Sequence, residues 1–288
     1  LGLQTEFISF PGIEGWRRGV DPERIAARLR EDTQHRIKAV CVVHNETSTG
    51  VVSDIAAVRQ AIDAAGHPAL LMVDAVSGLG SAEYRHDDWG VDVTIAGSQK
   101  GLMLPPGLGF NAISPKALEA SRQARLPKAF WAWDEYIEMN RGGYWPTTPA
   151  TNLLYGLHEA IDMILGEGLD NVLARHRRLG AACRAAIDAW GLENLCLDPA
   201  QVSPVSTAVL LPEAYDADGL RRLILERYNL SLGTGLGKVK GRVFRIGHLG
   251  DCNALTLLAA LSGCEMGLRA FGVPLKASGV VAAQDCLL

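Results

Sequence analysis

A lysine and an aspartate, Lys100 and Asp74, stand where two short apolar runs end. Residues 91–96 (VDVTIA) are rich in β-branched side chains and predict a strand buried on both faces, and Lys100 follows that strand in GSQKG. Residues 70–74 (LLMVD) predict a second buried strand, which ends in Asp74. In an open α/β sheet, ligands bind in the crevice beyond the carboxyl ends of the strands. Both charged side chains could therefore meet one ligand.

The chemistry open to this pair depends on Lys100, which has two interpretations. Taken alone, a lysine in such a loop is more often a solvated residue than a reactive one. The alternative is a Schiff-base lysine, whose amine condenses with a cofactor aldehyde. Asp74 favours this alternative, because an aspartate at a strand end could hold the protonated ring nitrogen of pyridoxal 5'-phosphate and keep the ring an electron sink.

Five motifs resemble those of a known family, both in their residues and in their order along the chain. They are VVHNETSTGV (residues 42–51), LLMVDAVSGLGS (70–81), IAGSQKGLMLPPGLG (95–109), TPATNLLYGLHEA (148–160) and FRIGHLGD (244–251). They are similar to motifs of the class-V, fold-type I aminotransferases, and within these to the serine–glyoxylate enzymes first and the alanine–glyoxylate enzymes next. The resemblance implies pyridoxal 5'-phosphate as cofactor and transfer of an amino group from a small amino acid, serine first, to glyoxylate. Alanine–glyoxylate and serine–pyruvate transfer are the alternatives.

The resemblance also implies a role for each of five residues around the cofactor. Lys100 would form the Schiff base and move the proton, and Asp74 would hold the ring nitrogen. The Thr47 hydroxyl would reach the phenolic oxygen of the ring or the phosphate. Val76 would pack on the ring face, although an ordinary core valine explains it as well. Gln99 would donate a hydrogen bond to the phosphate.

Arg245 and Thr148 complete the implied site. A guanidinium on a strand can hold a carboxylate with two parallel hydrogen bonds, and the resemblance assigns Arg245 to the α-carboxylate of the substrate. On the residues alone, a structural ion pair explains Arg245 equally well. Thr148 is implied to reach the cofactor phosphate of a partner subunit, which predicts a homodimer with shared active sites. We expect the aromatic-rich residues 125–144 to face that dimer.

The expected fold is α/β, with a mostly parallel, doubly wound sheet in the large domain. Strands at residues 39–43 and 70–74 alternate with a helix at 53–65, which is typical of such sheets. We predict a large cofactor-binding domain at residues 1–167 and a smaller α/β domain at 168–288. Gly166 and Gly168 are expected to break the long helical stretch 153–190 between the two domains.

The first ten residues, LGLQTEFISF, predict the end of a helix followed by a strand. In the family that the chain resembles, a substantial segment precedes this point. It carries the loop that holds the cofactor phosphate and the aromatic residue that stacks on the ring, and neither is located in this sequence. We therefore expect an N-terminally truncated family member, and a catalytically incomplete fragment that retains the fold stays an alternative.

Composition excludes several other classes of protein. The net charge of −4 and the lack of a basic run argue against nucleic acid as a partner, and no apolar stretch is long enough to cross a membrane. The six cysteines form no CxxC and predict reduced thiols in a cytoplasmic protein. The seven histidines show no metal-ligand spacing, so no metal site is expected.

Two rival activities would leave marks that this sequence lacks. A cysteine desulfurase of the same fold needs a mobile catalytic cysteine after the lysine, but the next one here, Cys183, falls in a predicted helix. A nicotinamide-dependent dehydrogenase should carry a clean GxGxxG after its first strand. GTGLGK (residues 233–238) fits neither that fingerprint nor a P-loop, and it is interpreted as a turn-rich connection.

Overall fold

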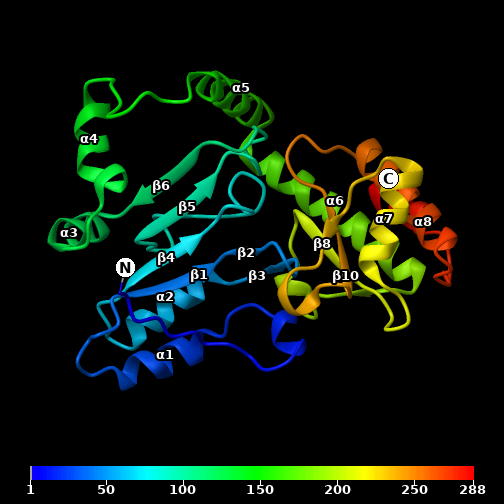
Figure 1. The fold of residues 1–288 in the computed structure, drawn as a ribbon, viewed down its shortest axis with the longest axis horizontal. Helices are drawn as coiled ribbons and strands as arrows, with labels where there is room; N and C mark the ends of the chain where they lie inside the picture. The colour runs from blue at the N-terminus through cyan, green and yellow to red at the C-terminus, as the bar shows by residue number, and fades with distance from the viewer. Residues whose placement is uncertain (1) are drawn as a thin grey trace.

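Short β-rich runs and capped helices build two four-stranded sheets in the computed structural model, which describes residues 2–288 (Figure 1). The elements of the first half are η1 (Glu14–Arg17), α1 (Pro22–Glu31), β1 (Ala39–Val43), β2 (Asn45–Glu46), β3 (Val51–Val52), α2 (Ile55–Ala64), β4 (Leu70–Asp74), β5 (Val93–Gly97), β6 (Gly109–Ile113), α3 (Pro115–Gln123), η2 (Ala129–Trp131) and α4 (Trp133–Arg141). Those of the second half are α5 (Thr151–Glu167), α6 (Leu169–Trp190), β7 (Glu193–Asn194), η3 (Pro199–Gln201), β8 (Ser206–Leu210), α7 (Ala217–Tyr228), β9 (Gly233–Thr234), η4 (Gly237–Val239), β10 (Val243–Gly247), α8 (Ala254–Ala270) and α9 (Gly279–Leu287).

The first sheet has the strand order β1-β4-β5-β6 and is mostly parallel, as predicted. β4 pairs in parallel with β1 and with β5, whereas β6 runs antiparallel to β5. The carboxyl ends of β1, β4 and β5 therefore lie at one edge of the sheet. The loops that begin at His44, Ala75 and Ser98 leave the sheet together at this edge.

Only one face of the first sheet is well buried, so the prediction of strands buried on both faces is wrong. Leu71 and Val73 of β4 pack with Ile55 of α2 in the first core. On the strands beside them, Ile95 is 43% exposed and Cys41 is exposed. Side chains alternate between the two faces of a strand, and α1 and α2 cover only the face that carries Leu71 and Val73.

The second sheet has the order β7-β8-β10-β9 and is antiparallel throughout. α6, α7, α8 and α9 enclose a larger core against it, in which Trp190, Leu220 and Phe244 are fully buried (Figure 1). The helix bounds follow capping residues closely. The Asp216 side chain accepts from the first turn of α7, and Asn229 ends that helix in the left-handed region.

Within the N-terminal segment, η1 packs on the second half of the chain, whereas Glu6 and Ser9 contact Arg28 and Arg24 of α1. Ile13 and Trp16 lie against the core of the second sheet, and Arg17 Nε donates to Leu195 O at 2.8 Å. The helix end and strand predicted for the first ten residues are not present: residues 2–10 form neither, and Phe7 is 90% exposed. Leu1 lies outside the described residues. No neighbouring strand pairs with residues 2–10, and without such a partner an apolar run does not become a strand.

The long helical stretch breaks at one of the two expected glycines. Gly168 has φ +87° and separates α5 from α6, as predicted, because a left-handed backbone cannot continue a helix. Gly166 lies inside α5, so the prediction of a helix break at Gly166 is wrong. Within residues 2–288, no helix combines the length and apolar character that a membrane crossing requires.

Candidate active site

The carboxyl edge of the first sheet brings together three loops that carry polar side chains. They follow β1, β4 and β5, and backbone hydrogen bonds tie them to one another. His44 N donates to Asp74 O at 2.9 Å, and Ala75 N donates to Ile95 O at 2.8 Å. The sheet itself therefore holds the three loops in place. The carboxyl edge from which they leave is where open α/β folds bind ligands.

Asp74 and Val76 stand at the start of the middle loop. The Asp74 side chain is exposed, and its Oδ1 accepts from Val76 N at 2.9 Å, which fixes the direction of the carboxylate. A side chain added at Gly97 would meet Gln99 Oε1 at 2.7 Å and Val76 Cγ1 at 3.5 Å. Val76 and Gln99 thus flank Gly97, where β5 ends beside β4. The predicted residues Asp74, Val76 and Gln99 do lie together.

Lys100 follows in the loop after β5 and is partly buried. Its carbonyl accepts from Met103 N at 2.9 Å in a tight turn. No hydrogen bond or ion pair joins its Nζ to any of residues 2–288. An amine without a carboxylate partner is available to react with a carbonyl or to move a proton, which is the state a Schiff-base lysine requires.

Thr47 lies on the loop after β1, and a residue that the sequence did not single out holds it. Its Oγ1 is 2.5 Å from Oγ of Ser77, which is buried. The two hydroxyls join the first loop to the loop after Asp74. One hydroxyl donates to the other, and the hydrogen of the second is left to donate to a ligand oxygen. Ser77 could have been noticed as the hydroxyl in DAVSG, three residues after Asp74.

Arg245 reaches this edge from the other sheet. It lies on β10, is partly buried, and donates through Nε to Thr234 O at 2.8 Å and through Nη1 to Thr47 O at 2.7 Å. Both acceptors are uncharged. No carboxylate among residues 2–288 forms an ion pair with Arg245, so the structural ion pair considered above is not found. Burial lowers the pKa of Arg245, and the nearby charge of Arg221 lowers it further, because both destabilise the charged guanidinium. An anionic ligand would relieve this cost.

Thr148 does not join this cluster. It is exposed in the segment between α4 and α5, and no hydrogen bond within the described chain links it to the other predicted residues. In the part of the chain from η2 to α5, which contains Thr148, the side chains of Trp131, Tyr144 and Tyr155 are 78%, 69% and 80% exposed. Apolar surface of this extent on one segment is typical of a protein interface.

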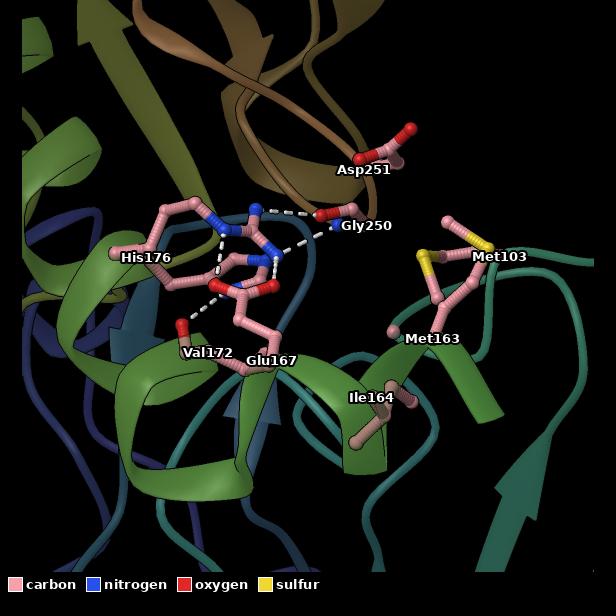
Figure 2. A pocket seen from close by; sticks show the side chains of 10 residues that line it. Met103, Met163, Ile164, Glu167, Val172, His176, Gly250 and Asp251 are labelled. Atoms are coloured by element: carbon pink, nitrogen blue, oxygen red, sulfur yellow. Dashed lines mark hydrogen bonds and ion pairs between the residues drawn. The ribbon is translucent and has the colours of Figure 1, made fainter. Parts of the chain in front are cut away.

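A set of contacts that the sequence analysis did not predict holds the loop after β10 against the long helices α5 and α6 (Figure 2). Arg175 on α6 forms an ion pair with Glu167 at the end of α5, and its Nη1 donates to Gly250 O at 2.9 Å and Cys252 O at 2.8 Å. His176 Nε2 accepts from Gly250 N at 3.1 Å. Burial lowers the pKa of His176, which keeps this nitrogen an acceptor.

The same loop touches the turn that carries Lys100. Gly250 has φ +77°, and a side chain there would meet Met103 Cγ at 3.2 Å. Between this turn and α5 lies a cavity of about 40 Å³ lined by Gly101, Met103, Met163 and Glu167, among others (Figure 2). The cavity is far too small for a cofactor or amino acid and has room only for ordered water. The contacts therefore position the loops rather than bind a substrate.

The geometry also bears on the rival activities. Cys183 is fully buried in α6, and burial raises the pKa of its thiol to about 12, so it cannot supply the thiolate that a desulfurase needs. Gly233 and Thr234 of the GTGLGK stretch form the edge strand β9 instead of a loop opening onto a helix. Residues 2–288 contain no cluster of three metal-ligating side chains.

Comparison with known proteins gives this geometry a family. The family model described as aminotransferase class-V matches residues 20–237. The serine–glyoxylate aminotransferase of Arabidopsis thaliana is 50% identical over 274 residues, which cover 94% of this chain and 68% of that protein. The enzyme of the same name from Methylorubrum extorquens is 52% identical over 280 residues, which cover 95% of this chain and 70% of that protein.

A solved structure shows the same fold. The pyridoxamine–pyruvate aminotransferase of Mesorhizobium loti superposes with a TM-score of 0.85 at 30% identity, covering 94% of this chain and 69% of that one. The family model spans both the loops of the first sheet and the helices that fasten them, and half of the aligned residues are identical in the plant and bacterial relatives. With its fold-type I architecture, the chain belongs to the class-V aminotransferase family.

Proposed function

We propose that this protein is a pyridoxal 5'-phosphate-dependent transaminase that moves the amino group of a small amino acid, serine first, to glyoxylate. The observation that carries the proposal is Arg245, a partly buried guanidinium held by two carbonyls and without an acidic partner among residues 2–288. Such a group is suited to a carboxylate, the one group that every amino acid and oxoacid substrate shares. The names of the two serine–glyoxylate relatives supply the first donor and acceptor to test.

The residues at the sheet edge fit the cofactor. Lys100 offers the cofactor aldehyde an amine that has no partner among the described residues, and Asp74 offers the ring nitrogen an exposed carboxylate at a strand end. The hydroxyls of Thr47 and Ser77 suit a phenolic or phosphate oxygen, and Val76 and Gln99 suit the ring face and the phosphate. When bound, the cofactor would supply an electron sink that stabilises the carbanion formed at the substrate Cα.

Each residue then has a defined task in the proposed reaction. Lys100 Nζ would take the proton from the substrate Cα and hold it for the return step, as a positioned general base and acid. The Asp74 carboxylate would hold the protonated ring nitrogen through a charge-assisted hydrogen bond. Arg245 orients the α-carboxylate of serine in one half-reaction and that of glyoxylate in the other. One carboxylate grip for both partners suits a ping-pong exchange of the amino group.

We propose that the working unit is a homodimer with shared active sites, located in the cytoplasm. Thr148 would serve the cofactor phosphate of the partner subunit, which agrees with its exposure in its own chain. The exposed aromatic residues of the segment before α5 would cover the dimer contact. The two domains would divide at Gly168, into 1–167 and 168–288, with η1 packing across onto the second domain.

The donor is the least constrained part of the proposal. Alanine–glyoxylate and serine–pyruvate transfer use the same carboxylate grip and the same cofactor. A pocket that must separate a methyl from a hydroxymethyl group gains only a modest factor in rate, unless it places a hydrogen bond on the hydroxyl. Initial rates with serine and alanine as donors, against glyoxylate and pyruvate as acceptors, rank the four pairs directly.

Covalent labelling tests the proposal itself against a fragment that retains the fold without activity. Pyridoxal 5'-phosphate is titrated into the protein, and the visible absorbance of the bound cofactor is recorded before and after borohydride reduction. A transaminase should show the band and, after reduction and digestion, a cofactor mass on the peptide that contains Lys100. A protein that never develops the band, or carries the label on another lysine, would refute the assignment.

A further inference from the structure

The reach of Arg245 depends on what lies beside it in the second sheet. β9 is the edge strand of that sheet, and Arg245 of β10 stands directly opposite Gly233. Gly235 N donates to Val243 O. In this antiparallel pair, the backbone N–H and C=O groups of odd-numbered residues such as Gly233 and Gly235 therefore point toward β10. The carbonyl of Thr234 points the other way, toward the open edge of the sheet. Arg245 Nε donates to that outer carbonyl at 2.8 Å. The guanidinium must therefore lie across β9 at Gly233.

Gly233 leaves the space for this crossing. A Cβ atom built on it would lie 3.0 Å from Cβ, 3.2 Å from Nε and 3.3 Å from Cζ of Arg245. These distances are shorter than ordinary van der Waals contacts, so any side chain at this position would push the arginine away. The φ angle of Gly233 is outside the left-handed region, and the backbone does not itself require glycine. Glycine is needed here because the side chain of Arg245 occupies the space that a side chain at residue 233 would fill.

We propose that Gly233 is a positioning residue for Arg245, which leaves room for the guanidinium to lie across β9 and so sets the affinity of the site for the carboxylate that donors and acceptors share. The inference rests on the proposed role of Arg245 and extends it to a residue of the second domain. A second residue on the same edge supports it. Arg221 Nε donates to Leu232 O, two residues before Thr234, and carbonyls two apart in a strand point the same way.

The charges around the two arginines favour an incoming anion. Asp218 accepts from Arg221 Nη1 at 3.0 Å and from Thr234 Oγ1 at 2.9 Å, so this acid is already engaged. Glu46 is near enough to raise the pKa of Arg245 but forms no ion pair with it. The two carbonyls and the space at Gly233 already restrict the rotamers of Arg245 before substrate arrives, so substrate binding does not have to restrict them.

The test is Gly233→Ala in the complete protein loaded with pyridoxal 5'-phosphate. Serine and glyoxylate should both show KM raised by the same factor, about tenfold, because a displacement near 1 Å costs up to about a hundredfold and the clash here is smaller. The kcat value and the visible absorbance of the cofactor should stay unchanged. Calorimetry with 2-methylserine, which lacks the Cα proton and cannot be transaminated, should show the same loss in binding without any turnover.

Two comparisons separate positioning from a general structural defect. Gly166→Ala is the matched control, since Gly166 has no atom within 4 Å of an added Cβ and lies in the exposed helix α5. In an Arg245→Lys background, Gly233→Ala should cost much less than in the parent, because lysine has no Nε or Cζ to displace. A crystal structure of Gly233→Ala should show the guanidinium withdrawn from Thr234 O.

Three outcomes would overturn the inference. If Gly233→Ala binds 2-methylserine as the parent does while Arg245→Lys binds it weakly, Gly233 has no positioning role. If Gly233→Ala changes the cofactor absorbance, KM, kcat and the thermal midpoint together, its role is structural. If Arg245→Lys itself leaves KM for both substrates unchanged, the proposed grip of Arg245 fails, and the inference about Gly233 fails with it. The first outcome leaves the proposed transaminase function standing, whereas the last one does not.

Discussion

The two four-stranded sheets of this protein are protected from water to different degrees. In the second, Val209 of β8 and Phe244 and Ile246 of β10 are at most 1% exposed. In the first, Leu71 is fully buried on one face, but Ile95 is 43% exposed on a neighbouring strand. The second sheet is thus a closed core, and the first is a platform with one open side.

The proposed chemistry divides along the same line. Lys100, Asp74 and Thr47 stand on loops of the open sheet, where a ligand can reach them. Arg245 alone comes from the closed sheet, whose rigid strands fix the direction of its guanidinium. Substitutions on the open sheet should therefore change turnover with little effect on stability, and substitutions in the closed core should do the reverse.

The largest effect on the open side is expected from Lys100→Ala. Loss of the amine removes both the cofactor anchor and the proton carrier, so transamination of the complete protein should fall by about a thousandfold or more. The thermal midpoint should stay unchanged, because Nζ has no partner within residues 2–288. Steady-state rates and a thermal melt measure both, with Lys240→Ala as an exposed control. Turnover retained without added amine would break the assignment.

The closed side is tested by Leu220→Ala, set against Ile95→Ala on the open sheet. Leu220 is fully buried, and truncating a buried leucine costs about 2–5 kcal/mol of unfolding free energy. Ile95→Ala should cost less than about 1 kcal/mol, since much of that side chain already meets water. Urea unfolding gives both values. Equal losses at the two positions would show that the two sheets do not differ in the way described.

Local patterns in the sequence were enough to find the elements. β1 and β4 have the predicted bounds, because apolar runs between polar loops mark their ends. The loops at the carboxyl edge follow from those strands, and so does the neighbourhood of Asp74 and Gln99. Lys100, like Asp74, was found from its place after a buried strand, whereas Thr47, Val76, Gln99, Thr148 and the substrate role of Arg245 came through family motifs, and all these roles stay predictions.

Long-range packing was beyond the reach of the sequence. A run such as VDVTIA looks the same whether helices cover both faces of its strand or only one, so the exposure of Ile95 was not foreseen. Gly233 was interpreted as part of a turn-rich connection, because nothing local shows that it pairs with Arg245 across the sheet. The Arg175 contacts with residues 250 and 252 join segments far apart in the chain for the same reason.

A smaller effect on turnover is expected from Asp74→Asn. An amide cannot hold a positive charge on the ring nitrogen, so the rate should fall by about a hundredfold, as for loss of one preorganised electrostatic contact. Cofactor binding should persist, since Lys100 is untouched. Single-turnover kinetics with serine measure the step directly, and Asp87→Asn is an exposed control. A variant as fast as the parent would leave Asp74 as an ordinary strand-end acid.

The closed core also has a charged element, Glu265 of α8. Its Oε2 accepts from Trp190 Nε1 at 3.0 Å and from Gly279 N at 2.8 Å, at the start of α9. One carboxylate thus joins α6, α8 and α9. Burial alone would raise the pKa of Glu265, but hydrogen bonds from Trp190, Arg269, Val280 and Ser278 outweigh it and hold the pKa at about 2, below the usual 4.5.

The smallest expected effect follows from that pKa and depends on pH. Because the folded state holds the proton of Glu265 less tightly than the unfolded state, the stabilisation is complete above pH 4.5 and is lost as the pH falls toward 2. Glu265→Gln should therefore lower the free energy of unfolding by about 2 kcal/mol at neutral pH. The gap between parent and variant should close in urea titrations below pH 4.5, while exposed Glu226→Gln should show no gap at any pH. A gap that stays constant down to pH 2.5 would mean that the charge of Glu265 does not hold α9 in place.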